Sequence, residues 1–575
     1  MMACITLFDK KRNFMPSLIK KTKGKKDYYY IVQSARVNGK PRIVWQKYLG
    51  TVEGILQMAK QNLAPTPSEI VLFEAGGVAA LLYIAQKIDL VKIIDQIVHK
   101  RAQGPSVGQY ILLAALNRAL DPLSKSQIGE WYEKTSLKRL WKFPSENFSS
   151  QRFWDHMDMI PQEAIDKIQD LLVKKIQNEF SLDAKTLLYD TTNFFTYIDT
   201  HNSRNDIAQR GRNKQKRSDL RQVNLALLTT RNFQIPLFHK IYRGDVPDVK
   251  SFEDISQDLL KKQKELFEFS EATLVFDKGN LYEKTMEKFL YNDVHFISGV
   301  KADLSKVIFE TPLEKLQMIP QLPGTKSFEA TIELYGKSCK AILCYSESFF
   351  TQQLASLTTS ISKCQNNLKN LQKSLASYAQ KQRGPKPTVS GVKRNIQKII
   401  SSPQLREVFS ISLDETQSTP QLQYSINQQN LYQLTSCKLG RTLLVTNRQE
   451  WPAHEIITYY RELANIEEAF KHLKNRKYLH WQPAFHWTDQ KLAVHSFYCV
   501  LALTLVALAR KVAYEKGVEL PFPRFLEELS EIKEVALLYS MAKGKFRTQC
   551  TLSKMNPGQK KLSEIFNIAT ILSQG

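Results

Sequence analysis

Three acidic residues have side chains and positions that could support metal-dependent chemistry. Asp190 ends the apolar run of LLYDTT, Asp277 ends that of LVFDKG, and Glu467 lies in the helical segment RELANIEEAFKHLKN. An acid at the carboxyl end of a strand sits at the sheet edge where α/β proteins build their sites. We therefore expect Asp190 and Asp277 to converge at one edge, with Glu467 supplied by a helix packed across it.

Attack on a phosphodiester by water or a 3′ hydroxyl is the reaction that needs such acids. Two Mg²⁺ ions roughly 3.5 to 4 Å apart can clamp the attacking and leaving oxygens. Three carboxylates and one phosphate balance the charge of two divalent ions, whereas two carboxylates would leave the site positive. Taken singly, each acid has an ordinary alternative: a strand-end cap for Asp190, a turn former for Asp277, and a solvated helix acid for Glu467 or Glu468.

A basic segment follows the Asp190 strand. Residues 201–221, HNSRNDIAQRGRNKQKRSDLR, hold seven Lys or Arg and two Asp. Such a segment is either a solvated loop or a clamp on phosphates, and its closeness to Asp190 favours the clamp. The candidate DNA-binding residues in it are Arg210, Arg212, Lys214, Lys216 and Arg217.

Composition limits the classes of protein that fit. The 575 residues include 81 Lys or Arg and 56 Asp or Glu, a net charge of +25 that favours a polyanionic partner. A 43% hydrophobic share excludes a mostly disordered chain. Neither a P-loop nor a Gly-x-Gly-x-x-Gly motif is present, so no nucleotide cofactor is expected. Seven cysteines without a C-x-x-C pair indicate neither a disulfide framework nor a zinc ribbon, and we expect a reducing compartment.

Membrane insertion is not expected. The N-terminal segment lacks the sustained apolar stretch of a secretory signal, so we expect the protein to stay where it is made. Residues 492–509 are uncharged and long enough to suggest a membrane span. His495, Ser496 and Thr504 interrupt that run, which favours a buried core helix instead.

Hydrophobic patterning divides the first 300 residues into a strand hairpin, a helical region and a mixed α/β region. DYYYIVQSARVNGKPRIVWQKYLG at 27–50 predicts two strands around Asn38-Gly39, and the first fifty residues carry twelve Lys or Arg against two acids. This basic hairpin could lie on a phosphate backbone or be a solvated edge. Helical periodicity follows from about 68 to 179, and between 186 and 300 the pattern is three strands, a helix, a strand, a helix and a strand.

A long basic interruption comes next. Residues 348–406 contain ten Lys or Arg and no acid, and apolar residues from Leu354 to Tyr378 keep 3-4 spacing. We expect a helical hairpin whose two apolar seams face each other, inside a subdomain at about 300 to 450.

The domain organisation that this pattern predicts has six parts. These are a basic hairpin region (1–65), a helical domain (66–180), an α/β segment (181–300), an inserted subdomain (301–450), a second segment of the α/β domain (451–515) and a basic C-terminal tail (516–575).

Several segments of the sequence resemble those of insertion-sequence transposases of the DDE type that carry a β-rich insertion and a Tyr-Arg-Glu-Lys signature. These segments are YDTTNFF, VNLALLTTRNFQIPLFHKIYRGDVPD, LVFDKGN, YRELANIEEAFKHLKN, WQPAFHW and LAVHSFYCVLAL. The resemblance reaches to about residue 510. It implies an α/β fold with a ribonuclease H-like mixed-sheet catalytic domain and an inserted α+β subdomain, and Asp190, Asp277 and Glu467 as the metal ligands. It also implies that 66–180 binds DNA ends and that 181–300 and 451–515 are the two parts of the catalytic domain.

The signature matches at three of its four positions. Tyr460, Glu467 and Lys474 fall in register, which selects Glu467 over Glu468, and in relatives the Tyr and Lys hold the DNA end. The Arg position is Leu463. Arg461 is a nearby candidate DNA-binding residue, but on a helix it points about 200° round from position 463 and cannot make the same contact. Seven-residue spacing puts Tyr460, Glu467 and Lys474 on one face of a single helix.

The sequence and the resemblance together predict a DNA transposase. It would bind terminal inverted repeats, cut with two Mg²⁺ or Mn²⁺ ions, and transfer 3′ ends into target DNA. We expect it in the cytoplasm, on a prokaryotic nucleoid, and not at a membrane. Its partners would be double-stranded DNA and a second copy of the chain, with the 354–378 seam as a candidate dimer contact. The alternatives are a nuclease or resolvase of the same fold, and a DNA-binding protein that has lost catalysis.

Overall fold

The computed structural model divides the chain into two compact units. One comprises Met1–Leu72 and Val535–Thr551, and the other Phe73–Glu534 and Leu552–Gly575. The described residues are 16–24, 26–37, 40–61, 66–100, 103–183, 185–199, 201–213, 215–247, 250–258, 272–281, 283–301, 305–416, 419–482, 484–540 and 546–574. The boundaries expected near 180, 300, 450 and 515 do not separate compact units, because the segments that they divide lie in one unit.

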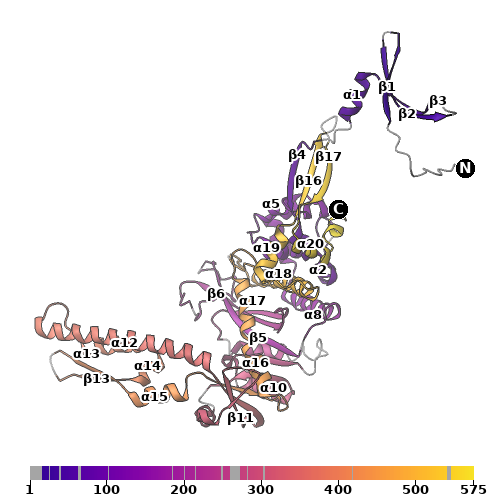
Figure 1. Ribbon diagram of the computed structural model, residues 1–575. Helices are drawn as coiled ribbons and strands as arrows, with labels where there is room; N and C mark the ends of the chain where they lie inside the picture. The colour runs from indigo at the N-terminus through magenta and orange to yellow at the C-terminus, as the bar shows by residue number, and fades with distance from the viewer. Residues whose placement is uncertain are drawn as a thin grey trace. The chain divides into compact units, whose positions relative to one another are not determined.

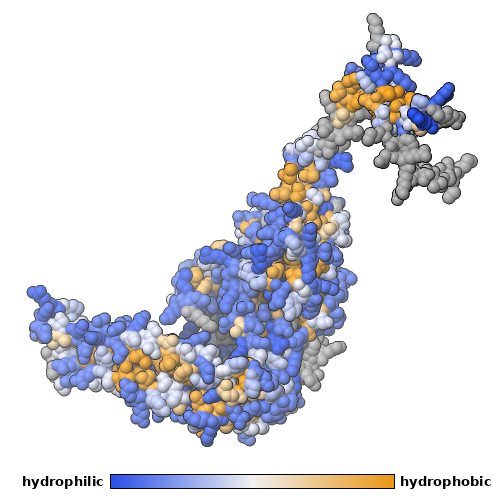
Figure 2. Space-filling model, in the orientation of Figure 1, coloured by the Kyte–Doolittle hydropathy of each residue, from blue (hydrophilic) through white to orange (hydrophobic). Residues whose placement is uncertain are grey.

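Three antiparallel strands form a sheet in the first unit. They are β1 (Ser17–Lys23), β2 (Lys26–Val37) and β3 (Lys40–Gly50), with α1 (Val52–Gln61) after them. The two strands expected at 27–50 are present, and their Asn38-Gly39 turn lies outside the described residues. Apolar side chains are exposed over this sheet and α1 (Figure 2), among them Ile43, Trp45 and Leu56.

The C-terminal region is folded, where a basic tail was expected. It contains α19 (Phe522–Ser530), β16 (Lys533–Ser540), β17 (Phe546–Leu552), α20 (Pro557–Ile565) and α21 (Ile568–Ser573), and the strand order β17-β16-β4 includes β4 (Glu69–Glu74). Phe525, Leu529 and Phe566 are buried in the main core. Their apolar spacing, rather than the net charge of the segment, decides the structure.

A nine-stranded mixed sheet organises the second unit (Figure 1). Its order is β10-β11-β12-β15-β9-β8-β5-β6-β7, and β5, β8 and β9 are parallel neighbours while every other pair is antiparallel. The strands are β5 (Thr186–Thr196), β6 (Arg221–Thr230), β7 (Pro236–Arg243), β8 (Thr273–Phe276), β9 (His295–Gly299), β10 (Gln317–Met318), β11 (Thr325–Leu334), β12 (Lys337–Ser346) and β15 (Arg441–Thr446).

Alternation along the strands gives this sheet two buried faces. Leu188, Val275 and Ile297 belong to one apolar cluster, together with residues of α16 (Ala453–Arg461), α17 (Ala464–Leu473) and α18 (Asp489–Glu515). Tyr189 and Phe276 belong to the other, with residues of α10 (Glu283–Tyr291) and of the helix at 250–258. Asp190 and Asp277 have the parity of Leu188 and Val275, so they lie on the face that α16 and α17 cover.

α18 is the central helix of the main core. It is long and apolar enough to cross a membrane, yet its most apolar stretch is completely buried inside the protein. A helix that is apolar on all sides is stable when other elements surround it, and α18 packs against helices of the 76–179 region and against β7. The helices of that region in contact with α18 are α2 (Gly76–Lys87), α4 (Val107–Leu120), α7 (Ser150–Asp158) and α8 (Gln162–Glu179); the region also contains α3 (Leu90–Ile97), α5 (Ile128–Glu133) and α6 (Leu137–Trp141). The prediction of a buried core helix is confirmed.

The inserted region is only partly separate from the sheet. β11, β12 and β15 extend the nine-stranded sheet beyond β9, which sequence patterning did not predict because strand pairing is non-local. The arm, which we define as residues 347–437, has its own apolar core. It contains α12 (Glu347–Lys381), α13 (Val389–Ile399), α14 (Pro403–Val408), β13 (Phe409–Asp414), β14 (Gln421–Ile426) and α15 (Gln428–Cys437).

The α12 seam is covered within the chain. Leu357, Cys364, Leu368 and Leu375 are buried in the apolar core of the arm, in which α12 contacts β14, α13 and α14. The expected helical hairpin is present, but its partner elements also include a strand hairpin. The seam is therefore not the exposed dimer contact that the sequence suggested, because the same apolar side chains already pack inside the arm.

Replacing a seam residue tests this assignment. Leu368→Ala should destabilise the arm by about 2–5 kcal/mol, because it removes buried methyl groups and leaves a cavity. Hydrogen exchange of the arm amides would measure the loss, with Asn366→Ala on the exposed face as the control. Sedimentation should give an unchanged mass for both variants; a change in association state with Leu368→Ala would instead favour an intermolecular seam.

Candidate active site

Strand pairing places the two aspartates next to each other. The parallel register of β5 and β8 ends with Tyr189 opposite Phe276, and Asp190 and Asp277 are the next residues of the two chains. Asp277 follows its strand, as expected, and precedes the short η2 helix (Lys278–Asn280). Asp190, however, lies inside β5, which continues to Thr196 because it stays paired with β6. At Asp190, therefore, the parallel pairing of β5 with β8 stops, but the strand itself continues.

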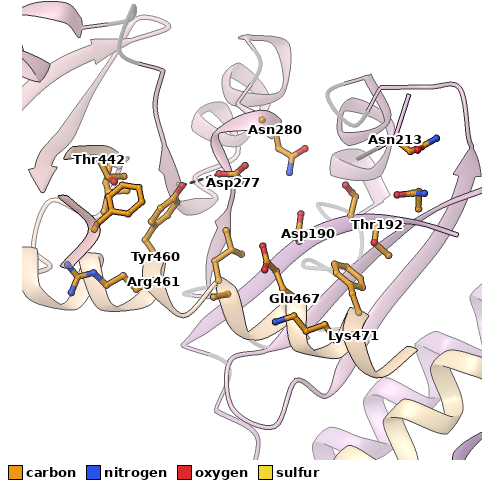
Figure 3. Close-up of a pocket in the computed structure, with 18 of the residues that line it drawn as sticks. Asp190, Thr192, Asn213, Asp277, Asn280, Thr442, Tyr460, Arg461, Glu467 and Lys471 are labelled. Atoms are coloured by element: carbon orange, nitrogen blue, oxygen red, sulfur yellow. Dashed lines mark hydrogen bonds between the residues drawn. The ribbon is translucent and has the colours of Figure 1, made fainter. Parts of the chain in front are cut away.

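Glu467 reaches the same place from α17. It lies in the first turn of that helix, which packs on β5. Asp190, Asp277 and Glu467 all line one cleft of about 1500 Å³, and Figure 3 shows their carboxyl groups directed into it. Glu468 is exposed and is not among the lining residues. The convergence expected from the strand ends and the helix is therefore present.

Hard oxygen donors dominate the centre of this cleft. Within the described residues no three His, Cys, Asp or Glu side chains are close enough to form a ready metal site. The cleft does contain an additional oxygen that sequence reasoning missed: Asn280 is buried, and its Oδ1 has no hydrogen-bond partner. A buried carbonyl oxygen without a donor suits a cation, so the donor set fits a hard divalent ion.

Tyr460 is held against Asp277. Its Oη donates a hydrogen bond to Asp277 Oδ1 at 3.1 Å. Burial, reinforced by the negative Asp277 carboxylate, raises the pKa of Tyr460, so the phenol remains a donor. Beneath it, a Cβ on Gly299 would come within 2.4 Å of Tyr460 Oη. The last residue of β9 must therefore be glycine for Tyr460 to reach Asp277.

Lys474 lies at the other end of the cleft. Its Nζ donates to Thr192 Oγ1 at 2.6 Å and sits 5.2 Å from the centre of the Phe194 ring. These contacts tie the end of α17 to β5. Lys471, one helical turn after Glu467, also lines the cleft (Figure 3). Its i+4 spacing from Glu467 was the signal that could have identified it.

The expected single helix through Tyr460 and Lys474 is wrong. α16 ends at Arg461 and α17 begins at Ala464, because the turn between them is tightened by i→i+3 bonds from Leu463 N to Tyr460 O and from Ile466 N to Leu463 O. Tyr460, Glu467 and Lys474 nevertheless all line the cleft. Neither Gly nor Pro marks this interruption in the sequence.

Leu463 and Arg461 also face the cleft. Leu463 supplies no donor where the family signature has Arg, and it packs against the main core. Arg461 donates from Nη2 to Thr325 Oγ1 at 2.9 Å. Its guanidinium is thereby directed to β11; whether Arg461 contacts DNA stays a prediction.

The basic segment 201–221 contributes only in part. Arg212 lines the cleft with its neighbours Asn213 and Gln215. Arg217 instead forms a two-point ion pair with Asp219 at 2.7 Å, and this partner lowers the pKa of Asp219 to about 2. Arg210 and Lys216 are exposed and are not among the lining residues, and Lys214 lies outside the described residues.

Comparison with known proteins gives only distant likeness, and it is to solved structures. No protein-family model matches the chain, and no curated protein matches it. A cryo-EM structure of a piggyBac transposase synaptic complex with hairpin DNA aligns over 81% of this chain and 82% of its own, with 8% identity and a TM-score of 0.36. Likeness at this level identifies no corresponding residues, so the argument for the site rests on its own geometry.

Gly299 and Tyr460 form a pair that can be tested by a double-mutant cycle. Gly299→Ala should lower the free energy of unfolding by about 1–3 kcal/mol, because the new methyl group overlaps Tyr460 Oη. In the Tyr460→Phe background the cost should fall, since the nearest atom is gone, leaving a coupling of about 1 kcal/mol. Urea denaturation of the four proteins measures it, and an equal cost in both backgrounds would contradict the packing described.

Proposed function

We propose that this protein is a DNA transposase that cuts phosphodiester bonds with a divalent metal and joins 3′ ends to target DNA. The observation that carries the proposal is the convergence of Asp190, Asp277 and Glu467 in one cleft that Lys471, Lys474 and Arg212 also line. Acids at the centre suit a metal, and cations around them suit the phosphates of a nucleic acid. The net charge of +25 agrees with a polyanionic substrate.

Sheet topology supports a ribonuclease H-like catalytic domain. The five strands β7-β6-β5-β8-β9 form a mixed sheet in which the first three along the chain are antiparallel and the last two add in parallel. This arrangement fits the fold that the resemblance implies. The acids lie on one face of it, under α16 and α17.

The chain's own residues have separable roles in this proposal. Asp190, Asp277 and Glu467 would hold Mg²⁺ or Mn²⁺, two ions in the expected case, with Asn280 Oδ1 as a further oxygen. When bound, the metal supplies charge neutralisation at the phosphate and lowers the pKa of the attacking water or hydroxyl. Tyr460 orients Asp277 through its hydrogen bond, while Lys471, Lys474 and Arg212 bind backbone phosphates.

Two other functions fit the same cleft. A nuclease or resolvase would cut without joining, and a decayed transposase would bind DNA without cutting. Leu463 in place of the signature Arg is the observation that favours the decayed protein, whereas the three acids in one cleft favour an active enzyme. Because joining brings two ends together, we expect a dimer or larger assembly on DNA.

Replacing the acids one at a time tests the proposal. Asp190→Asn, Asp277→Asn and Glu467→Gln should each reduce metal-dependent cutting of a labelled duplex carrying the element's own terminal repeat by ~10²-fold or more, because each removes a metal ligand. Binding to the duplex should persist.

Glu468→Gln provides the matched control, since it removes an equal charge one residue away and should cut normally. Joined products in the wild-type reaction support transposition, and cutting without joining supports the nuclease. Unimpaired cutting by all three acid variants would rule out the proposed site.

Asn280 can be tested by metal binding alone. Asn280→Leu should weaken Mn²⁺ binding by about 10-fold, because it removes an oxygen from the cleft. Asn280→Asp keeps an oxygen and should retain binding. Electron paramagnetic resonance of free Mn²⁺ measures the affinity, and equal affinities for Asn280→Leu and wild type would exclude Asn280 as a ligand.

A further inference from the structure

The longest helix of the arm starts in the active-site cleft. Ser348, Phe349 and Gln352, all in the first two turns of α12, line the same cleft as residues of α16 and α17. From there α12, which is 35 residues long, extends away from the sheet (Figure 1), and α13 and β14 pack against it. At 1.5 Å per residue the helix is about 50 Å long. Whatever occupies the cleft can therefore continue along α12.

Helical geometry defines which side of α12 continues the cleft. Residues advance by about 100° each, so the row that begins with Ser348 lies about 180° from the buried seam of Leu357 and Leu375. This row, which we call the α12 track, lies on the solvent side of the arm. The track comprises Ser348, Gln352, Thr359, Lys363, Asn366, Lys369, Asn370, Lys373, Ser377 and Lys381, and every member is exposed.

The track is basic and has no acid. All four lysines of α12 lie within about 60° of the row. The single acid of the helix is Glu347, its first residue. A solvated helix face ordinarily mixes both signs of charge. Within the described part of the chain, the arm lysine that forms an ion pair is Lys393, and not a lysine of α12. A one-sided charge of this kind is suited to a polyanion.

We propose that the α12 track binds the backbone of duplex DNA that leaves the active-site cleft. Lysines, hydroxyls and amides are the side chains that contact phosphates and sugars without reading sequence. A helix about 50 Å long matches roughly 15 base pairs at 3.4 Å each. This inference rests on the proposed function, because it assumes that the cleft binds DNA. What is new is that the α12 track binds the duplex outside the cleft.

Salt-dependent binding of a 40-base-pair duplex of arbitrary sequence tests the track. The track variant replaces Lys363, Lys369, Lys373 and Lys381 with Gln. The control variant replaces four exposed lysines of the same unit that lie elsewhere, Lys167, Lys174, Lys516 and Lys560, so both variants lose an equal charge. Fluorescence anisotropy between 50 and 400 mM NaCl gives the slope of log affinity against log salt for each protein.

The track variant should lose up to about 3.6 from the magnitude of this slope, because each phosphate contact contributes about 0.9. The control variant should keep the wild-type slope. Equal slopes for track variant and wild type, with DNA still bound, would overturn the track and leave the proposed function intact. Absence of DNA binding by the wild type at 50 mM NaCl would overturn both.

Discussion

The parallel pairing of β5 with β8 is the constraint on which the site depends. It brings Asp190 and Asp277 out of the paired region at adjacent positions and on the same face of the sheet. Every other part of the site is arranged relative to that edge: α17 crosses β5 with Glu467, and α16 places Tyr460 over the end of β9. The buried α18 lies in the same core and supports these helices.

Because the helix is interrupted between α16 and α17, this one segment of the chain contacts two strands of the sheet, β9 and β5. Tyr460 packs on β9 and bonds to Asp277, whereas Lys474 bonds to Thr192 of β5. The cleft thus has carboxylates at its centre and amines at its margin. Charged groups gathered in this way cost free energy when they are removed from water without partners. The same distribution suits a charged substrate with bound cations.

Sequence patterning anticipated the parts of this fold that are locally determined. Apolar runs predicted β5 to β9 in their correct order. The positions of Asp190 and Asp277 at the ends of apolar runs predicted their convergence, and the resemblance selected Glu467 as the acid from the helix. Patterning did not predict the non-local pairing: β12 and β15 join the same sheet as β9, and β5 continues past Asp190 because it stays paired with β6. The helix break at Leu463 could not be predicted because neither Gly nor Pro occurs there. Asn280 could not be identified as a candidate metal ligand because the burial of its Oδ1 is known only from the structure.

Cleavage of the protein by a bound metal is the most direct test of the central claim that the three acids share one metal site. Fe²⁺ with ascorbate and peroxide generates radicals that cut the nearest backbone, and mass spectrometry locates the cuts. The account predicts cleavage near Asp190, Asp277 and Glu467 together, suppressed by excess Mg²⁺. Cleavage confined to one of these segments, or at other positions only, would contradict it.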